Sequence, residues 1–393
     1  MKVLFVHDGP MLSNSAKDIF YGVHYTDEIV ERYSFFGNVV TFLMRNKVIS
    51  DNDGLKYTKL THKAFRFIEV PNFKSITSKI KQFQANKIIK QAVNEHDFII
   101  VRLPSANGLM AKKIAVELGK PVLVEVVACV YDALWNYDWR GKLLAKYKYH
   151  QYRKAIKSAS HVIYVTQHFL QSRYPTNGYQ IGCSDVVINI IDETVLTKRF
   201  EKINKKSENI VLGTVAAIDV VYKGQADIIK VLSNLKQLGF TNFKYKIVGQ
   251  GNPIRLQQLI TSFNLNEQVE ILGSMPHNQI FDFMDSLDLY IQPSKQEGLP
   301  RAVIEAISRA CPVIATNIAG HPELINKSAL FEPGNFSQIE GFLLNFNKLP
   351  IRDWAAENFK TSKNYHSNFL NQKRIEFYNR VLTDFNLTIT TQN

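Results

Sequence analysis

PSKQEGLPRAVIEAISRACPVIATNIAGHPELI, residues 293–325, is the stretch that decides the fold. A short apolar run of the buried-strand type precedes it at 287–291, and another lies inside it at 313–315. Between them, Gly298 and Pro300 break the chain just before RAVIEAIS, whose apolar residues have helical spacing. The stretch therefore predicts a strand–loop–helix–strand unit of a parallel sheet.

The same alternation of buried-type strands and amphipathic helices extends over most of the chain and occurs twice. The sequence therefore predicts an α/β protein of two Rossmann-like, doubly wound domains that face each other across a cleft. The predicted strands of the first half are 2–6, 39–44, 65–70, 98–102, 122–127 and 162–165. Those of the second half are 210–215, 245–248, 269–272, 287–291 and 313–315.

Domain boundaries are expected where this alternation stops. Residues 192–209 are polar and Lys-rich without a clear apolar period, which predicts a linker. We expect an N-terminal domain at 1–191, a C-terminal domain at 192–370, and a C-terminal helix and tail at 371–393 that return to the first domain.

The composition excludes several classes of protein. The 393 residues are 45% hydrophobic and 21% charged, so disordered, fibrous and low-complexity chains are ruled out. Lys and Arg number 48 against 35 Asp and Glu, which gives a net charge of +13. This excess indicates an anionic partner, which is a nucleic acid, a phosphate-bearing small molecule or an acidic membrane face.

The three cysteines, Cys129, Cys183 and Cys311, are widely spaced and lack the pairing typical of zinc sites. They indicate a reducing compartment, and we expect a cytoplasmic location. The N-terminal run MKVLFVHDGP is too short for a signal peptide or a membrane span.

The loop and helix at 297–305 predict a binding site for a phosphorylated ligand. Gly298 allows close approach of the backbone, and Pro300 begins a helix whose first N–H groups face the cleft, which suits a phosphate. Glu305, one turn inside the helix, is placed to accept hydrogen bonds from ribose hydroxyls, and Glu297 lies at the mouth of the loop.

These two glutamates, with seven residues between them in EGLPRAVIEA and followed by PVIATNIAGHPELI, resemble the C-terminal signature of retaining glycosyltransferase family 4, the glycosyl transferases group 1. Further landmarks of that family occur in order: GTVAAIDVVYKGQ, KYKIVGQGNP, VEILGSM and DLYIQPS. The resemblance implies the GT-B fold, an N-terminal domain on the acceptor side and a C-terminal domain that binds a nucleotide-sugar of the UDP or GDP type.

The resemblance also implies donor-binding and catalytic residues. Lys223 matches the lysine that holds the donor diphosphate, but no cation stands between Gly213 and Lys223 where the family has an arginine, so Arg301 or a first-domain residue is the substitute to consider. Catalytic roles are expected for Glu297, Glu305 and Glu125. The residues expected to contact the donor are Lys223, Gly249, Gly251, Ile271, Gly298, Leu299, Pro300, Arg301 and Glu305.

The first domain offers fewer landmarks. His7, Asp8 and Gly9 directly follow the first predicted strand, and we expect a loop there that lines the cleft. The family often has a histidine after the strand at 122–127, but this chain reads VEVVACVYD, which leaves Glu125, Tyr131 and Asp132 as the polar candidates.

No metal and no cofactor are expected, since the nucleotide-sugar is the substrate. For this class the resemblance implies attack by the acceptor hydroxyl on the face that the nucleotide leaves, without a dedicated protein nucleophile. The one Asp-x-Asp, at 51–53, is predicted to be a solvated turn.

Two basic segments of the first half suggest a surface for an anionic partner. Residues 140–157 contain seven Lys or Arg and no acid, with apolar side chains between them, and 76–90 has the same character. Each is either a solvated helix face or a docking site for an acidic membrane. The second alternative predicts a peripheral protein at the inner face of the cell membrane with a lipid-linked acceptor.

The leading hypothesis is a glycosyltransferase that moves a sugar from a nucleotide-sugar to a glycan or lipid-linked acceptor in surface polysaccharide biosynthesis. A non-catalytic GT-B subunit that binds a nucleotide or glycan and supports a partner enzyme is the alternative. A nonhydrolysing GT-B epimerase shares the architecture. Nucleic-acid binding is supported by charge alone, so no nucleic-acid partner is expected.

Overall fold

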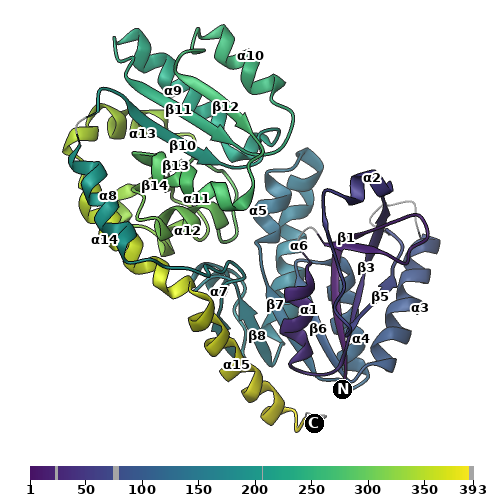
Figure 1. Cartoon of the computed structure of the whole chain (residues 1–393). Helices are drawn as coiled ribbons and strands as arrows, with labels where there is room; N and C mark the ends of the chain where they lie inside the picture. Colours follow the sequence, from purple (N-terminus) through teal and green to yellow (C-terminus); the bar gives the residue numbers. More distant parts are fainter. Residues whose placement is uncertain (23–24, 74–78, 206, 389–393) are drawn as a thin grey trace.

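The computed structural model describes residues 1–22, 25–73, 79–205 and 207–388. Two α/β domains, each built on its own sheet, lie one beside the other (Figure 1). Most strands are runs of buried apolar side chains, because helices cover both faces of each sheet. The predicted fold class is confirmed.

The first sheet has the parallel order β5-β3-β1-β6-β7-β8-β9, which is the Rossmann order extended by one strand. Short β2 pairs antiparallel with the far end of β1, and β4 pairs antiparallel with β2. The strands are β1 (Lys2–Ser13), β2 (Phe20–Gly22), β3 (Val39–Val48), β4 (Thr58–Lys59), β5 (Phe65–Glu69), β6 (Phe98–Leu103), β7 (Val122–Val126), β8 (His161–Tyr164) and β9 (Tyr179–Gly182).

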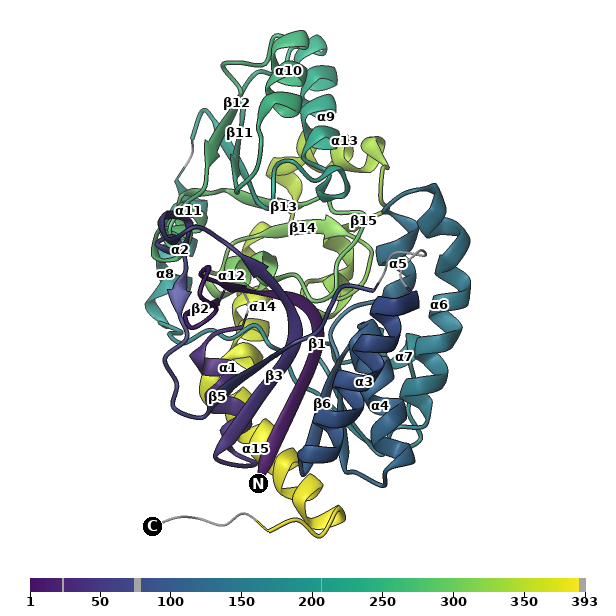
Figure 2. The same cartoon turned by 90° about the vertical axis from the view of Figure 1, so that its right-hand side faces the viewer.

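Two helical layers enclose this sheet. One layer holds α3 (Lys79–Glu95), α4 (Ala106–Glu117), α6 (Trp139–Lys157) and α7 (Phe169–Arg173), which share one apolar core, and Figure 2 shows them together on one side. The other layer holds α1 (Asp27–Ser34) and α15 (Ser367–Asp384). The short helices α2 (Asp51–Gly54) and α5 (Val130–Trp135) complete the domain.

The second sheet has the all-parallel order β12-β11-β10-β13-β14-β15, which is the Rossmann order 3-2-1-4-5-6. Its strands are β10 (Ile210–Val215), β11 (Phe243–Val248), β12 (Val269–Gly273), β13 (Leu289–Gln292), β14 (Val313–Thr316) and β15 (Leu330–Phe331). Its helices are α8 (Thr194–Asn204), α9 (Gln225–Gln237), α10 (Ile254–Ser262), α11 (His277–Ser286), α12 (Arg301–Ser308), α13 (Phe336–Leu344) and α14 (Ile351–Ser362). Single 3-10 turns are η1 (Val221–Lys223), η2 (His321–Glu323), η3 (Lys327–Ala329), η4 (Phe346–Lys348) and η5 (Lys363–Tyr365).

The chain passes between the domains twice, and the two passages are paired. The Ile188 N–H donates to the Tyr365 carbonyl at 2.9 Å, and the Ser367 N–H donates to the Ile188 carbonyl at 3.0 Å. After this crossing α15 runs along the first domain, as Figure 1 shows, and Phe377 and Tyr378 are buried in the same core as α1. Both connections therefore cross between the domains at one place.

Two local expectations are wrong. The loop predicted at His7, Asp8 and Gly9 is strand, because β1 continues to Ser13 and pairs there with β3 and β2. The linker predicted at 192–209 contains α8, whose Arg199 is buried and donates to the carbonyls of Leu287 and Met284 at the end of α11. A polar residue that caps a buried helix end gives no apolar period in the sequence.

The turn predicted at 51–53 is α2, a single helical turn that the Ser50 side chain caps at the Asp53 N–H. Within the described residues, no group of three or more His, Cys, Asp or Glu lies close enough to hold a metal ion. Residues 76–78, the predicted start of the helix that the structure has as α3, lie outside the described residues.

Candidate active site

Two loops at the carboxyl ends of β10 and β13 meet at the centre of the candidate site. The loop after β10 ends in η1, and the Lys295 N–H donates to the Tyr222 carbonyl at 2.7 Å. Gly224 follows with φ +78°, and a Cβ there would stand 2.1 Å from the Pro293 carbonyl oxygen. Only glycine allows this approach, and it brings Lys223 to the loop of Glu297.

Lys223 and Glu297 form a half-buried ion pair. The Lys223 Nζ lies 2.7 Å from the Glu297 Oε1, and the two side chains are 20% and 10% exposed. The same carboxylate oxygen accepts from the Gln292 amide at 3.0 Å, and the Tyr290 hydroxyl donates to the Gln292 Oε1 at 2.6 Å. Since Tyr290 and Gln292 are buried in β13, they fix the orientation of Glu297.

Glu305 is buried in α12 and pairs with a residue of another helix. The His277 Nε2 lies 2.9 Å from the Glu305 Oε1, and His277, at the first position of α11, is 64% exposed in its side chain while Glu305 is 5% exposed. Pro300 is the N-cap of α12, and Arg301 at the first helical position is exposed. This corner of the site carries an acid that faces an exposed imidazole.

The predicted donor-site glycines bring backbone segments together. A Cβ on Gly249 would stand 1.9 Å from the Ala216 carbonyl oxygen, and one on Gly251, at φ +125°, would stand 2.5 Å from the Asp219 carboxylate. Both glycines therefore hold the loop that leads to Lys223 against β11. Ile271 lies in β12, half-buried against the apolar core of the second domain.

The loop of Glu297 also touches the first domain. A Cβ on Gly298 would stand 2.8 Å from the Val127 carbonyl oxygen, and Leu299 packs on the apolar cores of both domains. The site loop thus lies directly across from the end of β7.

Asp8 binds the N-terminal end of α4 in the first domain. Its carboxylate accepts from the Ser105 hydroxyl at 3.0 Å and from the N–H groups of Ala106 and Asn107 at 2.8 and 2.9 Å, where α4 begins. The His7 Nδ1 accepts from the Gly9 N–H at 2.9 Å and lies 2.6 Å from the Tyr25 hydroxyl. These contacts position α4 and the end of β1.

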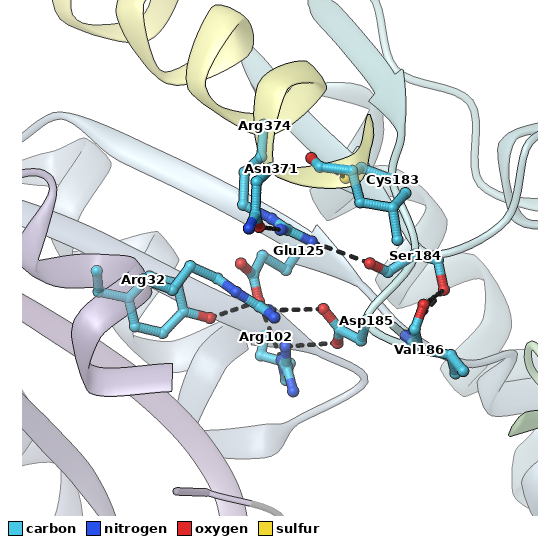
Figure 3. A network of polar contacts seen from close by, with 11 residues as sticks. Arg32, Arg102, Glu125, Cys183, Ser184, Asp185, Val186, Asn371 and Arg374 are labelled. Atoms are coloured by element: carbon cyan, nitrogen blue, oxygen red, sulfur yellow. Dashed lines mark hydrogen bonds and ion pairs between the residues drawn. The ribbon is translucent and has the colours of Figure 1, made fainter. Parts of the chain in front are cut away.

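Glu125 lies in a buried ion network and not beside Glu297 or Lys223. Its Oε2 accepts from the Tyr33 hydroxyl at 2.8 Å and from the Arg102 Nε at 3.0 Å. Asp185 accepts from Arg102 and Arg32 at 2.6 and 2.8 Å, and Figure 3 shows both guanidiniums directed at its carboxylate. We call Arg32, Arg102, Glu125 and Asp185 the arginine network.

Burial in the arginine network would by itself raise the pKa of Asp185. The guanidiniums of Arg102, Arg32 and Arg374 outweigh this effect and lower the pKa to about 2. Arg374 of α15 also donates to the Ser184 carbonyl at 2.9 Å, so the network holds the beginning of the interdomain passage (Figure 3).

Four residues of the site region were not singled out from the sequence. His277 and Gln292 contact the two predicted glutamates, as described above. Glu323 of η2 accepts from the N–H groups of 167, 168 and 169 at 2.5, 3.0 and 2.7 Å and so joins the second domain to the start of α7. The fully buried His321 Nδ1 lies 2.7 Å from the Thr316 carbonyl oxygen, and burial lowers its pKa. His321 and Glu323 stand within the quoted GHPELI, which was the signal for them.

A cavity of about 870 Å³ opens beside this site, between the domains. The second domain contributes His277 and Arg301, and the first contributes Arg32 of α1. Asp185, 30% exposed in its side chain, and Arg374 line it as well. Its volume fits a ligand of the size that protein clefts commonly bind.

Comparison with known proteins agrees with this architecture. Residues 197–347 match the family model of the glycosyl transferases group 1. The chain is 29% identical over 402 residues to Protein CapJ of Staphylococcus aureus, and the match covers 98% of each chain. It is 34% identical over 122 residues to the putative colanic acid biosynthesis glycosyltransferase WcaL of Escherichia coli (strain K12), covering 29% of this chain and 30% of WcaL.

The solved structure of HepE from Anabaena in complex with UDP has a TM-score of 0.67 and 16% identity to this chain, and the alignment covers 97% of this chain and all of HepE. This likeness shows the fold. The two Rossmann-type domains therefore form a protein of the GT-B class. Within that class, the chain carries a glycosyl transferases group 1 domain at residues 197–347.

Proposed function

We propose that this glycosyltransferase moves a sugar from a UDP- or GDP-type nucleotide-sugar to a glycan or lipid-linked acceptor, with retention of the anomeric configuration, in surface polysaccharide biosynthesis. The observation that carries the proposal is the Lys223–Glu297 pair beside the first turn of α12. The printed description of WcaL, a putative colanic acid biosynthesis glycosyltransferase, supports the pathway, and the UDP complex of HepE supports the donor class.

The leaving diphosphate is assigned to Lys223 and to the N–H groups that begin α12. The Lys223 ammonium has three N–H donors, and among the described residues its one carboxylate partner is Glu297. A diphosphate oxygen is a stronger partner than the half-buried carboxylate alone, and the end of the helix adds a favourable partial charge. Both groups stabilise the negative charge that builds up as the sugar leaves.

The ribose is assigned to Glu305 and the imidazole of His277. A buried carboxylate accepts two hydroxyl donors well, and His277 already orients the Glu305 Oε1 at 2.9 Å. The cavity that His277 and Arg301 line is the space for the nucleoside, and Arg301 is the cation nearest in sequence to replace the missing family arginine.

Glu297 is assigned to the sugar itself. Its orientation by Gln292 leaves the carboxylate at the junction of the two loops, where the anomeric carbon would lie next to Lys223. In the proposed reaction the acceptor hydroxyl attacks from the side of the departing diphosphate, whose oxygen takes the hydroxyl proton. The positive charge of Lys223 supplies the stabilisation, and the proposal includes no metal.

A peripheral membrane location is part of the proposal. Ile80 and Phe83 in the first turns of α3 are 76% and 74% exposed, and Leu143 of α6 is 73% exposed. Both helices cover the same face of the first sheet and begin at the carboxyl ends of its strands, so these apolar side chains share one end of the layer with Lys81, Arg140 and Lys142. Among the described residues, no helix is both long and apolar enough to cross a membrane.

Incubation with UDP- and GDP-sugars, followed by saturation-transfer NMR and by assay of released nucleotide, tests the function. We expect binding and release with at least one donor, and the anomeric coupling constant of the product reports retention. If the folded protein binds no nucleotide and no nucleotide-sugar, the proposal fails. For the membrane part, sedimentation with phosphatidylglycerol vesicles should exceed that with phosphatidylcholine vesicles and decrease with salt.

A further inference from the structure

A groove of about 490 Å³ runs along the outer side of the site, between the two domains. The first domain contributes Trp135, Tyr137 and Trp139 from the end of α5 to the start of α6. The second domain contributes Tyr222 of η1 and Lys295. We call this space the aromatic groove.

The aromatic side chains of the groove are exposed to an unusual degree. Trp135, Tyr137 and Trp139 are 46%, 83% and 67% exposed, whereas Trp354, the remaining one of the three tryptophans, is 2% exposed. Tyr131 stacks on Trp135 at 5.4 Å between ring centroids and 14° between planes, which holds the indole in place. Exposed aromatic rings that line a hollow, one of them fixed by stacking, indicate a binding surface.

The groove borders the reaction centre, because Lys295 lines both the groove and the neighbouring pocket that Glu297 lines. Tyr222 directly precedes Lys223, and Lys295 lies two residues before Glu297. The Asn136 amide donates to the Lys295 carbonyl across the domain boundary at 3.4 Å. The Lys223 Nζ lies 5.6 Å from the centroid of the Tyr222 ring, so a ligand that fills the groove lies close to the Lys223–Glu297 pair.

The lining mixes flat apolar faces with polar edges. Indole and phenol rings offer surfaces on which the C–H faces of a sugar ring can stack, and Asp138, Asn136 and Lys142 stand between them as partners for hydroxyl groups. A lipid chain would need a continuous apolar lining, which these polar residues interrupt. The chemistry fits a chain of sugar rings.

We propose that the aromatic groove is an acceptor subsite that binds the glycan portion of the acceptor by stacking on Trp135 and Trp139. This assignment rests on the proposed function, since it places the acceptor hydroxyl beside the donor sugar. The groove shares Lys142 with the basic segment 140–157, but Leu143, Leu144 and Tyr147 of that segment do not line it.

The test uses soluble, uncharged, lipid-free probes: chitotetraose, cellotetraose and maltotetraose, measured by saturation-transfer NMR and calorimetry. We expect at least one to bind the full-length protein, with affinity lowered about tenfold by Trp135→Ala and by Trp139→Ala. Tyr147→Ala is the matched control, because Tyr147 is an exposed aromatic of α6 outside the groove and should change affinity less than twofold. Circular dichroism confirms that each variant is folded.

Binding of UDP, measured on the same samples, separates this proposal from the proposed function. We expect the three variants to bind UDP, or GDP if that is the donor nucleotide, as the wild type does. If the wild type binds none of the tetrasaccharides, or binds one equally well after both tryptophan substitutions, the acceptor subsite is refuted. If phosphatidylglycerol vesicles and no tetrasaccharide shift the tryptophan fluorescence, the groove is a lipid surface and the proposal is also refuted.

Discussion

The arginine network of the first domain and the Lys223–Glu297 pair of the second are built from the same chemistry but differ in where they lie. Arg102 and Asp185 each contact two oppositely charged partners inside the first domain. Lys223 and Glu297 each have one such partner among the described residues, and they lie on two loops at strand ends of the second domain. Ionic groups that hold two charged partners each stabilise the fold, even though Asp185 and its partner Arg32 line the cavity, whereas a single pair on converging loops can exchange partners with a ligand.

This difference explains why Glu125 and Glu297, both expected to be catalytic, have separate roles in our account. Glu125 is 4% exposed and its Oε2 already accepts from Tyr33 and Arg102. Removing it from these partners for catalysis would break a buried ion pair and leave Arg102 with Asp185 as its one carboxylate partner among the described residues, at a cost of several kcal/mol. Glu297 has only side chains of the site itself as partners.

Breaking the arginine network should have the largest effect. Arg102→Met leaves Glu125 and Asp185 without their shared cation, and we expect the free energy of unfolding to fall by about 4 kcal/mol. Denaturant titration measures this loss. Lys113→Met, which removes an exposed ion pair with Glu117, should cost less than about 0.5 kcal/mol. Equal losses in the two variants would contradict the structural role of the network.

Glu305→Ala should lower the activity much more than the stability of the fold. The substitution removes a carboxylate assigned to the ribose, and we expect kcat/KM to fall about 100-fold, because two hydrogen bonds to a charged group are lost. Nucleotide release at several donor concentrations measures it. Glu340→Ala, which removes an exposed hydrogen bond from Asn234 in the same domain, is the control. Full activity of Glu305→Ala would remove Glu305 from the donor site.

Acid should weaken the first domain through Asp185. Because its folded pKa of about 2 lies below the unfolded value of 3.8, the ionised network stabilises the fold above about pH 5, and this contribution, about 2 kcal/mol, disappears as the pH falls toward 2. Thermal unfolding between pH 2.5 and 6 should show a steeper decline for the wild type than for Asp185→Asn. Parallel curves would mean that Asp185 does not titrate in this way.

The smallest effect is expected at His277, which contacts Glu305 from an exposed position. His277→Ala removes one hydrogen bond to the carboxylate, and we expect the KM for the donor to rise about fivefold with kcat nearly unchanged. Steady-state kinetics with varied donor check this split. His277→Gln should restore part of the loss, since its amide can donate to the same oxygen, and a fall in kcat alone would argue against a positioning role.

The fold was largely predictable because each parallel strand can be recognised from its own local sequence. Runs such as 98–102 and 313–315 are buried on both sides and lie between helical patterns, so the alternation alone indicates two Rossmann-like sheets. Gly239 after α9 has φ +90°, as expected of a glycine that ends a helix. In contrast, α8 depends on Arg199 reaching carbonyls almost 90 residues away, which no local pattern reveals.

The site residues were predictable only where several of them fall within one short sequence motif. Glu297, Glu305 and Pro300 fall within a few residues of one another, and Lys223 has the glycine that its turn requires. Their partners His277 and Gln292 look like an ordinary helix residue and an ordinary strand residue in the sequence. The contacts that they make with the glutamates depend on the folded structure, and the distance between residues along the chain does not indicate them. The same holds for Arg102 and Asp185, which are 83 residues apart.

The most direct test compares nucleotide release from UDP- and GDP-sugars by the wild type, Lys223→Ala and Lys230→Ala, the last a substitution of an exposed lysine on α9. Our account predicts release by the wild type and by Lys230→Ala, and a loss of about 10³-fold in Lys223→Ala with an unchanged unfolding transition. Equal release by folded Lys223→Ala and wild type would contradict the central claim that Lys223 holds the leaving diphosphate.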